Sequence, residues 1–204
     1  EFKHLGIFPE QAINWDFIRK IHDKHQEPMR ILNLFGYTGA ATIASAMGNV
    51  EEVVHVDALK SANQRTQENI ALNGLEHKKI RTLQDDVLKF IQREKRRGRT
   101  YHGIIMDPPS FGRGPKGERW KIETHLETLI EHATDLLDED AVFLIVNTYT
   151  AGLTPDDVLN IVKEKFNPGY GKFETTSIGL PIKNKPFPLK AGSTTRWCKY
   201  EDIT

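Results

Sequence analysis

The feature that most constrains this sequence is a regular alternation of short apolar runs with longer amphipathic stretches. The apolar runs predict five strands, at residues 31–35, 53–57, 80–83, 104–106 and 142–146. A stretch of helical character follows each strand, ending near residues 47, 73, 97, 137 and 166. Strands and helices that alternate in this way join through right-handed crossovers and build a parallel sheet with helices on both faces. The chain is therefore predicted to be an α/β protein.

The two ends of the chain depart from this alternation. Residues 175–182 and 194–200 predict two strands without a helix between them, so they should pair antiparallel. Residues 11–25 predict a helix that covers one end of the sheet. The 204 residues fit one compact domain, which we divide into an N-terminal segment and helix at 1–28 and a main domain at 29–204. Because the sequence does not begin with Met, this prediction leaves room for a further N-terminal domain.

Composition narrows the range of functions. The 28 basic and 28 acidic side chains give zero net charge, so the overall balance offers no support for a nucleic-acid partner. No apolar run approaches the ~18 residues that a transmembrane helix needs. Cys198 is the only cysteine, which excludes an internal disulfide and a thiolate metal cage and indicates a reducing, cytoplasmic compartment. No histidine pair has metal-ligand spacing with a carboxylate partner, so no metal is predicted.

A glycine-containing turn follows the first predicted strand, at residues 33–40. Ligands of an open α/β sheet bind beyond the carboxyl ends of its strands, and glycines there allow a tight turn and a close approach of the ligand to the backbone. Tyr37 and Thr38 separate Gly36 from Gly39, so the G-x-G-x-x-G pattern is incomplete and support for a pyrophosphate site is weak. A ligand-binding turn and a plain strand-to-helix turn are equally compatible with the residues alone.

Carboxylates end the second and third predicted strands. Asp57 lies about twenty residues after the glycine turn, where a carboxylate can accept hydrogen bonds from both hydroxyls of a ribose. We favour this role over its alternative, the capping of the next helix. Asp86, between Asp85 and Val87, can receive the exocyclic amine of an adenine while an apolar neighbour packs on the ring. Asp86 is equally suited to cap the helix that follows, and the two roles are compatible.

The sequence Asp107–Pro108–Pro109 comes directly after the fourth predicted strand. Two consecutive prolines fix the backbone, so the Asp107 side chain and the Pro108 carbonyl can converge on one amino donor. We interpret this loop as the place where a substrate nitrogen is held against an electrophile. The alternative is a rigid loop without a catalytic role.

Together these residues resemble the class I S-adenosylmethionine-dependent methyltransferases, and within them the large-subunit 23S ribosomal RNA methyltransferase-like group. The similarity runs from about His4 to Lys199. It rests on the following stretches: N-L-F-G-Y-T-G at 33–39, Asp57, the segment 68–75, Asp86, and D-P-P-S-F at 107–111. The resemblance implies a Rossmann-like seven-stranded sheet, mostly parallel with an antiparallel last strand, and S-adenosylmethionine as the cofactor.

The resemblance also implies a role for each matching residue. Around the methionine part of the cofactor it places Asn33, Phe35, Gly36, Tyr37, Thr38 and Gly39. It places Asp57 at the ribose and Asp86 with Val87 at the adenine. At the reacting centre it places Asp107, Pro108, Pro109, Ser110 and Phe111. The N-terminal segment resembles one that reaches over the cofactor, with Gln11 as its polar candidate.

The match to these relatives breaks in two places. Methylation at carbon 5 of a pyrimidine needs a cysteine thiolate that attacks carbon 6, and relatives with this activity carry the cysteine after the fifth strand, where residues 146–150 read V-N-T-Y-T. We expect Cys198 to be a packed core residue, which argues against cytosine C5 chemistry and favours nitrogen. Amino-directed relatives place an aromatic residue directly after the second proline, whereas Ser110 here precedes Phe111.

The expected function is therefore methylation of a base in RNA, with ribosomal RNA favoured. A protein or small-molecule methyltransferase and a non-catalytic binding module are the alternatives. The zero net charge is compatible with RNA because it sums opposed regions. Residues 127–164 carry nine acidic side chains and one basic, whereas 172–199 carry six basic and one acidic. Residues 111–121, predicted as a basic loop, carry four basic and one acidic.

Overall fold

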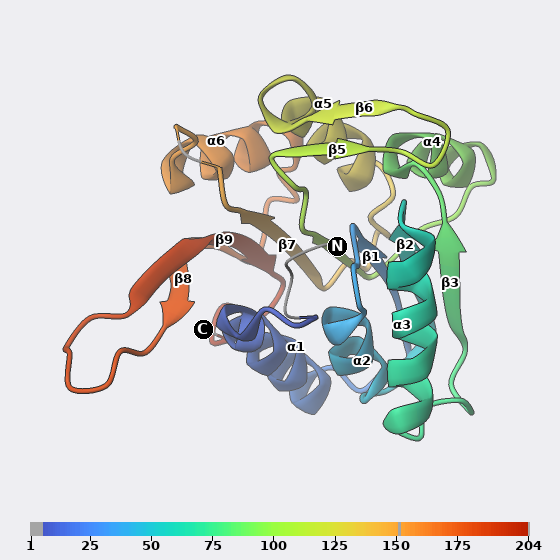
Figure 1. Cartoon of the computed structure of the whole chain (residues 1–204), viewed down its shortest axis with the longest axis horizontal. Helices are drawn as coiled ribbons and strands as arrows, with labels where there is room; N and C mark the ends of the chain where they lie inside the picture. The colour runs from blue at the N-terminus through green and yellow to red at the C-terminus, as the bar shows by residue number, and fades with distance from the viewer. Residues whose placement is uncertain (1–5, 151, 204) are drawn as a thin grey trace.

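Seven strands form one sheet in the computed structural model, which describes residues 6–150 and 152–203. They are β1 (Met29–Leu34), β2 (Val50–Asp57), β3 (Ile80–Gln84), β4 (Gly103–Met106), β7 (Phe143–Thr148), β8 (Lys172–Leu180) and β9 (Leu189–Cys198). Their order across the sheet is β3-β2-β1-β4-β7-β9-β8 (Figure 1). The first five pair in parallel, and β9 pairs antiparallel with both β7 and β8. The predicted mostly parallel sheet with an antiparallel ending is confirmed.

Helices cover both faces of this sheet (Figure 1). They are the 3-10 turn η1 (Pro9–Gln11) and helices α1 (Ala12–Lys24), α2 (Ala40–Ala46), α3 (Lys60–Leu72), α4 (Val87–Arg96), α5 (Ile122–Thr134) and α6 (Pro155–Lys165). One face packs on α1, α2 and α3, and the other packs on α4, α5 and α6. The helix predicted at residues 11–25 is in fact η1 followed by α1.

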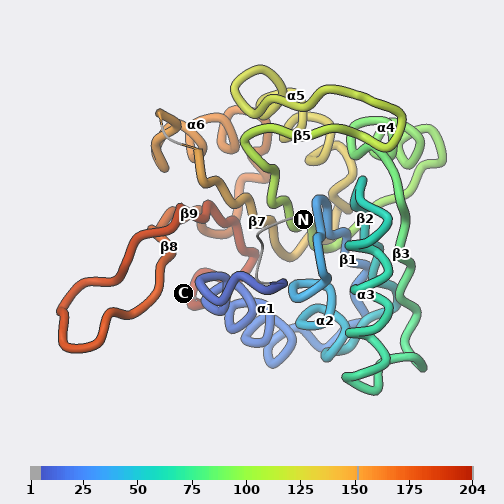
Figure 2. Tube along the Cα trace, viewed as in Figure 1, coloured from blue at the N-terminus to red at the C-terminus, as the bar shows by residue number. Residues whose placement is uncertain are grey.

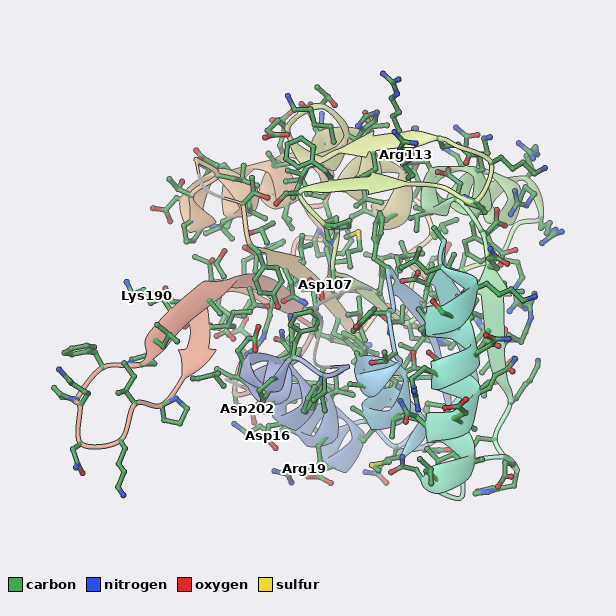
Figure 3. The ribbon with its side chains drawn as sticks, in the orientation of Figure 1. Asp16, Arg19, Asp107, Arg113, Lys190 and Asp202 are labelled. Carbon is green, nitrogen blue, oxygen red and sulfur yellow. The ribbon has the colours of Figure 1, made fainter. Side chains whose placement is uncertain are left out.

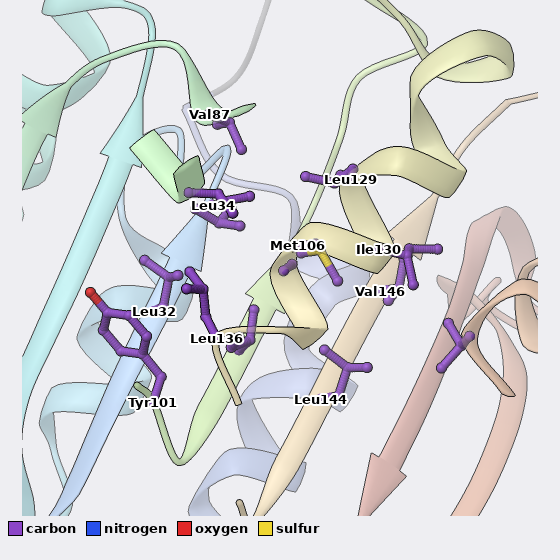
Figure 4. Packing of buried hydrophobic residues seen from close by; sticks show 14 of the residues in the cluster. Leu32, Leu34, Val87, Tyr101, Met106, Leu129, Ile130, Leu136, Leu144 and Val146 are labelled. Atoms are coloured by element: carbon purple, nitrogen blue, oxygen red, sulfur yellow. The ribbon is translucent and has the colours of Figure 1, made fainter. Parts of the chain in front are cut away.

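Strand β1 shows why the sheet is buried on both sides. Leu32 and Leu34 point to the face covered by α4 and α5, whereas Ile31 points to the face covered by α1. All three side chains are fully buried, and Figure 4 shows the packing around the two leucines. A strand buried on both faces reads as a continuous apolar run, which is the pattern that made it recognisable in the sequence.

Residues 111–121 differ from the prediction of a loop. They form an antiparallel hairpin of β5 (Phe111–Arg113) and β6 (Arg119–Lys121). We call residues 111–121 the β5–β6 hairpin. Each strand has only three residues, most of them charged or glycine, so no hydrophobic periodicity marks them in the sequence.

Candidate functional site

A cavity opens at the carboxyl ends of β1 and β4, where the strand order changes direction. Seven predicted site residues line it: Gln11, Asn33, Phe35, Gly36, Tyr37, Thr38 and Asp107. Asn14 and Asn147 also line it, and the sequence reasoning missed both. The other predicted site residues lie outside its lining: Gly39, Asp57, Asp86, Val87, Pro108, Pro109, Ser110 and Phe111.

The turn after β1 owes its shape to two glycines that act in different ways. Gly39 has a positive φ of 87° at the start of α2, a conformation that favours glycine. Gly36 instead provides space, because a Cβ atom there would lie 2.4 Å from the His55 ring. Phe35 and Tyr37 on either side of Gly36 also adopt positive φ values, 56° and 49°. The backbone therefore winds tightly over the end of β1, as the sequence predicts.

A buried polar chain supports this turn from below. The Asn33 amide donates a hydrogen bond to Thr42 Oγ1 at 2.9 Å, and Thr42 Oγ1 lies 2.9 Å from His55 Nδ1. Burial lowers the pKa of His55 to about 4, so its ring is neutral at physiological pH. No spacing pattern marks His55 or Thr42 as parts of a site, since a single buried histidine in a strand looks like any core residue.

Helix α3 holds the turn from the side. Thr66 Oγ1 donates to the Tyr37 carbonyl at 3.0 Å, and the Asn69 amide donates to the Thr38 carbonyl at 2.9 Å. Asn69 belongs to the segment 68–75 on which the resemblance partly rests. Its contact explains why that segment, which lies outside the cavity lining, matters to the turn.

Asp57 ties the end of β2 to the same turn. Its Oδ2 accepts a hydrogen bond from the Tyr37 N–H at 2.9 Å, and its Oδ1 accepts one from the Leu59 N–H at 2.8 Å. Burial raises the pKa of this carboxyl, and the two N–H bonds oppose that effect. Leu59, not Asp57, is the N-cap residue of α3, so the capping alternative does not hold. The ribose role stays a prediction.

Asp86 caps α4, as one of its two predicted roles requires. Its Oδ1 accepts a hydrogen bond from the Lys89 N–H at 2.9 Å. Val87 is buried in the core beside it. The turn of the β5–β6 hairpin comes close to this point, since a Cβ atom on Gly114 would lie 3.0 Å from Asp86 Oδ2. The adenine role of Asp86 and Val87 stays a prediction.

Asp107 has an unusual environment for a carboxylate. It follows β4 directly, and its Oδ1 is buried without a hydrogen-bond partner among the residues that the structure describes. Burial, with a smaller effect from the nearby charge of Glu10, raises the pKa of Asp107 to about 7. A buried acceptor without a donor is unfavourable by roughly 1–3 kcal/mol. The arrangement therefore suits a ligand that brings an N–H group to this oxygen.

Strand β6 and the segment after β7 hold the residues that follow Asp107. The Pro109 carbonyl accepts a hydrogen bond from Trp120 Nε1 at 2.6 Å, and Ser110 Oγ lies 2.6 Å from Thr150 Oγ1. The Pro109 carbonyl is thus already occupied, and the role of the Pro108 carbonyl beside Asp107 stays a prediction. Phe111 begins β5 with 67% of its surface exposed, so it contributes to the surface of the hairpin instead of the cavity.

Asn14 of α1 joins the N-terminal segment to the other side of the cavity. Its amide donates to Gln11 Oε1 at 2.6 Å and to Asn147 Oδ1 at 2.9 Å. Its Oδ1 accepts two hydrogen bonds from the buried Arg196 side chain, at 2.8 and 2.7 Å. Gln11 in turn donates to the Tyr149 hydroxyl. These contacts join residues up to 182 positions apart, so no local sequence pattern reveals them.

Residues 9–160 match the family model described as S-adenosylmethionine-dependent methyltransferase. This match covers most of the chain and includes the glycine turn, Asp57, Asp86 and Asp107. The chain belongs to the S-adenosylmethionine-dependent methyltransferases.

Individual relatives of this methyltransferase agree with that assignment. A crystal structure of an S-adenosylmethionine-dependent methyltransferase from Agrobacterium tumefaciens superposes with a TM-score of 0.90 at 35% identity, covering 98% of this chain and 65% of that one. A putative methyltransferase complexed with S-adenosylhomocysteine superposes with a TM-score of 0.68 at 25% identity. The superposition covers 94% of this chain and 50% of that one.

Among curated proteins, the ribosomal RNA large subunit methyltransferase I of Erwinia tasmaniensis is 38% identical over 93 residues. That match covers 46% of this chain and 24% of that protein. The matched segment thus spans about a quarter of the length of this curated relative.

The cavity of the methyltransferase fits its cofactor, S-adenosylmethionine, on two observations. Gly36 lets the turn pack directly on the His55 ring, where a Cβ atom would lie at 2.4 Å, and the backbone of the turn thereby lines the cavity. Phe8 and Trp15 of the N-terminal segment line the wall beside this turn and add apolar surface. The bound cofactor supplies an electrophilic methyl group. Which residues touch each part of it stays a prediction, as does the division at residue 28.

Cys198 of this methyltransferase lies far from the site along the sheet. It pairs with Phe143 at the start of β7, whereas Asp107 follows the end of β4, at the opposite edge of the sheet. Burial raises the pKa of the Cys198 thiol to about 11, so it is protonated at neutral pH. Within residues 6–150 and 152–203, no helix is long and apolar enough to span a membrane, and no group of three His, Cys, Asp or Glu residues is placed to hold a metal ion.

Proposed function

We propose that this methyltransferase modifies a nitrogen of an RNA base, in a cytoplasmic setting. The observation that carries the proposal is the buried Oδ1 of Asp107, which has no hydrogen-bond partner among the described residues and lies in the cavity beside the turn at residues 33–39. A base amine offers the N–H donor that this oxygen lacks. The name of the Erwinia tasmaniensis relative, a ribosomal RNA methyltransferase, supports RNA as the source of the amine.

The geometry of Asp107 suits methyl transfer to nitrogen. The reaction is an in-line displacement, so positioning of the nucleophile dominates the rate. The Asp107 carboxylate accepts one N–H of the amine and directs the nitrogen lone pair toward the methyl carbon. The carboxylate would also stabilise the positive charge that the nitrogen gains when it takes up the methyl group. With a pKa near 7, Asp107 can then take the proton that the nitrogen releases.

Cytosine C5 chemistry does not fit this site. It needs a thiolate at the cavity, whereas Cys198 is buried at the opposite edge of the sheet. Residues 146–150, where relatives with that chemistry carry the cysteine, contain none.

Labelled S-adenosylmethionine and ribosomal RNA that lacks its large-subunit modifications test the proposal. We expect label in the RNA, at an exocyclic or ring nitrogen mapped by mass spectrometry. Asp107→Ala and Asp107→Asn should each reduce methyl transfer by at least 100-fold while the dissociation constant for the cofactor changes less than about threefold. Label in proteins and none in RNA, or full turnover by both variants, would contradict the proposal.

A further inference from the structure

Strands β8 and β9 continue past the rest of the sheet. The last β7–β9 pair joins Thr148 to Ser193, but the β8–β9 pairing runs on through Ile178–Gly192 to Leu180–Leu189. We call residues 179–191 the arm. Figures 1 and 2 show it projecting as a long loop from the body of the molecule. Because β7 is parallel to β4, the arm leaves the sheet at the same edge as Asp107.

The arm combines positive charge with exposed apolar side chains. It carries Lys183, Lys185 and Lys190, and the whole stretch from 175 to 200 contains no acidic residue. Phe187 is 57% exposed and Leu189 is 60% exposed, although both are large hydrophobic residues. Lys185 Nζ lies 5.7 Å from the centre of the Phe187 ring. Lysines interleaved with an exposed aromatic ring are typical of surfaces that bind single-stranded nucleic acid.

The backbone of the arm is restrained before any partner binds. Pro181, Pro186 and Pro188 fix φ at three places around its tip. A pre-organised loop loses less conformational entropy on binding, so its few contacts contribute more to affinity.

The base of the arm contacts the wall of the cavity. Gly192 lies against Tyr149, since a Cβ atom there would be 2.7 Å from the Tyr149 ring. Tyr149 accepts the hydrogen bond of Gln11, which lines the cavity. A second basic element, the β5–β6 hairpin, rises from the same edge. In the view of Figure 3, Lys190 on the arm lies to the left of Asp107, and Arg113 on the hairpin lies above it.

We propose that the arm binds the single-stranded RNA that flanks the target base. This inference rests on the proposed RNA substrate. The three lysines contact phosphates, and Phe187 stacks on a base. An acidic protein would satisfy the lysines and could pack apolar surface on the ring, whereas a nucleic-acid base stacks on its face beside a phosphate that a lysine contacts. RNA uses both features, and the arm thereby adds affinity outside the catalytic pocket.

The test measures fluorescence anisotropy of a labelled, mixed-sequence 20-nucleotide RNA with the whole 204-residue chain. The triple variant Lys183→Gln/Lys185→Gln/Lys190→Gln should bind about 10- to 100-fold more weakly at low salt, and the slope of log affinity against log salt should fall by about 2. Phe187→Ala should weaken binding about 5- to 100-fold with the slope unchanged. The control Lys95→Gln/Arg96→Gln/Arg97→Gln removes equal charge at the end of α4 and should change affinity less than about threefold.

Measurements of folding and of competition by an acidic polymer separate a role in RNA binding from misfolding and from binding of an acidic protein. Cofactor affinity and melting temperature should match the unmodified chain in the arm variants, which excludes misfolding. If the unmodified chain binds RNA and the arm variants bind it equally well, the proposed role of the arm is overturned but the RNA substrate is not. No RNA binding by the unmodified chain would overturn the RNA substrate as well. Polyglutamate serves as a model of an acidic protein. If it displaces the RNA, and if its binding needs the same lysines but not Phe187, then the arm is a surface for an acidic protein and the inference is overturned.

Discussion

The turn at residues 33–39 and the two basic elements, the arm and the β5–β6 hairpin, lie at one edge of the sheet, but neighbouring residues hold them to different degrees. The turn at residues 33–39 receives hydrogen bonds from α3 and from the end of β2, and a buried polar chain through His55 lies beneath it. The arm is held by its own strand pairing, by a turn hydrogen bond from the Lys185 N–H to the Ile182 carbonyl, and by contacts at its base. If the two proposals hold, we expect changes near the turn to affect cofactor binding and stability together, and changes on the arm to affect RNA binding alone.

The β5–β6 hairpin lies between these extremes. Its strands are short and exposed, yet Trp120 packs on Phe35 of the turn with ring centroids 5.0 Å apart. Its turn also reaches α4, where Glu118 Oε1 lies 2.5 Å from Lys89 Nζ. Of the arm and the hairpin, as far as the structure describes them, it is the hairpin that packs directly on the turn at residues 33–39.

Gly36→Ala should have the largest effect. The new Cβ would lie 2.4 Å from the buried His55 ring, so the turn or the ring must move. We expect at least 100-fold weaker cofactor binding by calorimetry and a destabilisation of about 1–3 kcal/mol in urea unfolding. The matched control is Gly112→Ala in β5, where a Cβ would come no closer than 3.4 Å to its neighbours. Equal behaviour of the two variants would contradict the contrast between turn and hairpin.

Asp57→Asn should have the second-largest effect and weaken cofactor binding about 10- to 100-fold. The substitution weakens two hydrogen bonds from backbone N–H groups, and an amide cannot accept two ribose hydroxyls as a carboxylate does. Comparison of S-adenosylhomocysteine with its 2′-deoxy analogue isolates the ribose contact. The unmodified chain should prefer the full ribose, and the variant should lose most of that preference. An unchanged preference would mean that Asp57 only supports the turn.

The pH dependence of methyl transfer and of stability should reveal the ionisation of Asp107. Its raised pKa means that only the form above about pH 7 accepts the amine, so kcat/KM should fall about tenfold per unit below pH 7. In the folded chain this raised pKa lowers stability as pH rises from about 4 to 7, because the unfolded carboxyl ionises more readily. Asp107→Asn should therefore melt a few degrees higher at pH 8 and unchanged at pH 4. A melting difference that is the same at both pH values would contradict the buried charge.

The sequence reveals the fold and the turn because both leave local signals. Each parallel strand is a short apolar run, and Gly36 and Gly39 mark the turn that follows the first. Asp57 and Asp86 are predicted as site residues because each lies at the end of a recognisable strand. These signals depend on residues only a few positions apart in the sequence, so they can be recognised without the tertiary structure.

The supporting residues leave no such signal. His55 and Thr66 meet the turn through tertiary packing, and Asn14 reaches Asn147 across 133 positions. Their residue types are ordinary for a strand or a helix. The β5–β6 hairpin was missed for another reason, because its stability comes from Trp120, which lies against Phe35 and the Pro109 carbonyl instead of following an alternating pattern.

Trp120→Phe should give the smallest effect and sharpen the comparison most. Phenylalanine keeps the ring packing on Phe35 but loses the hydrogen bond to the Pro109 carbonyl. We expect the KM for RNA to rise about three- to tenfold, because a lost neutral hydrogen bond is worth about 1 kcal/mol, with cofactor affinity unchanged. Trp120→Ala also removes the ring, so cofactor affinity should then fall together with RNA affinity. If Trp120→Ala leaves cofactor affinity intact, the hairpin and the turn are energetically independent despite their contact.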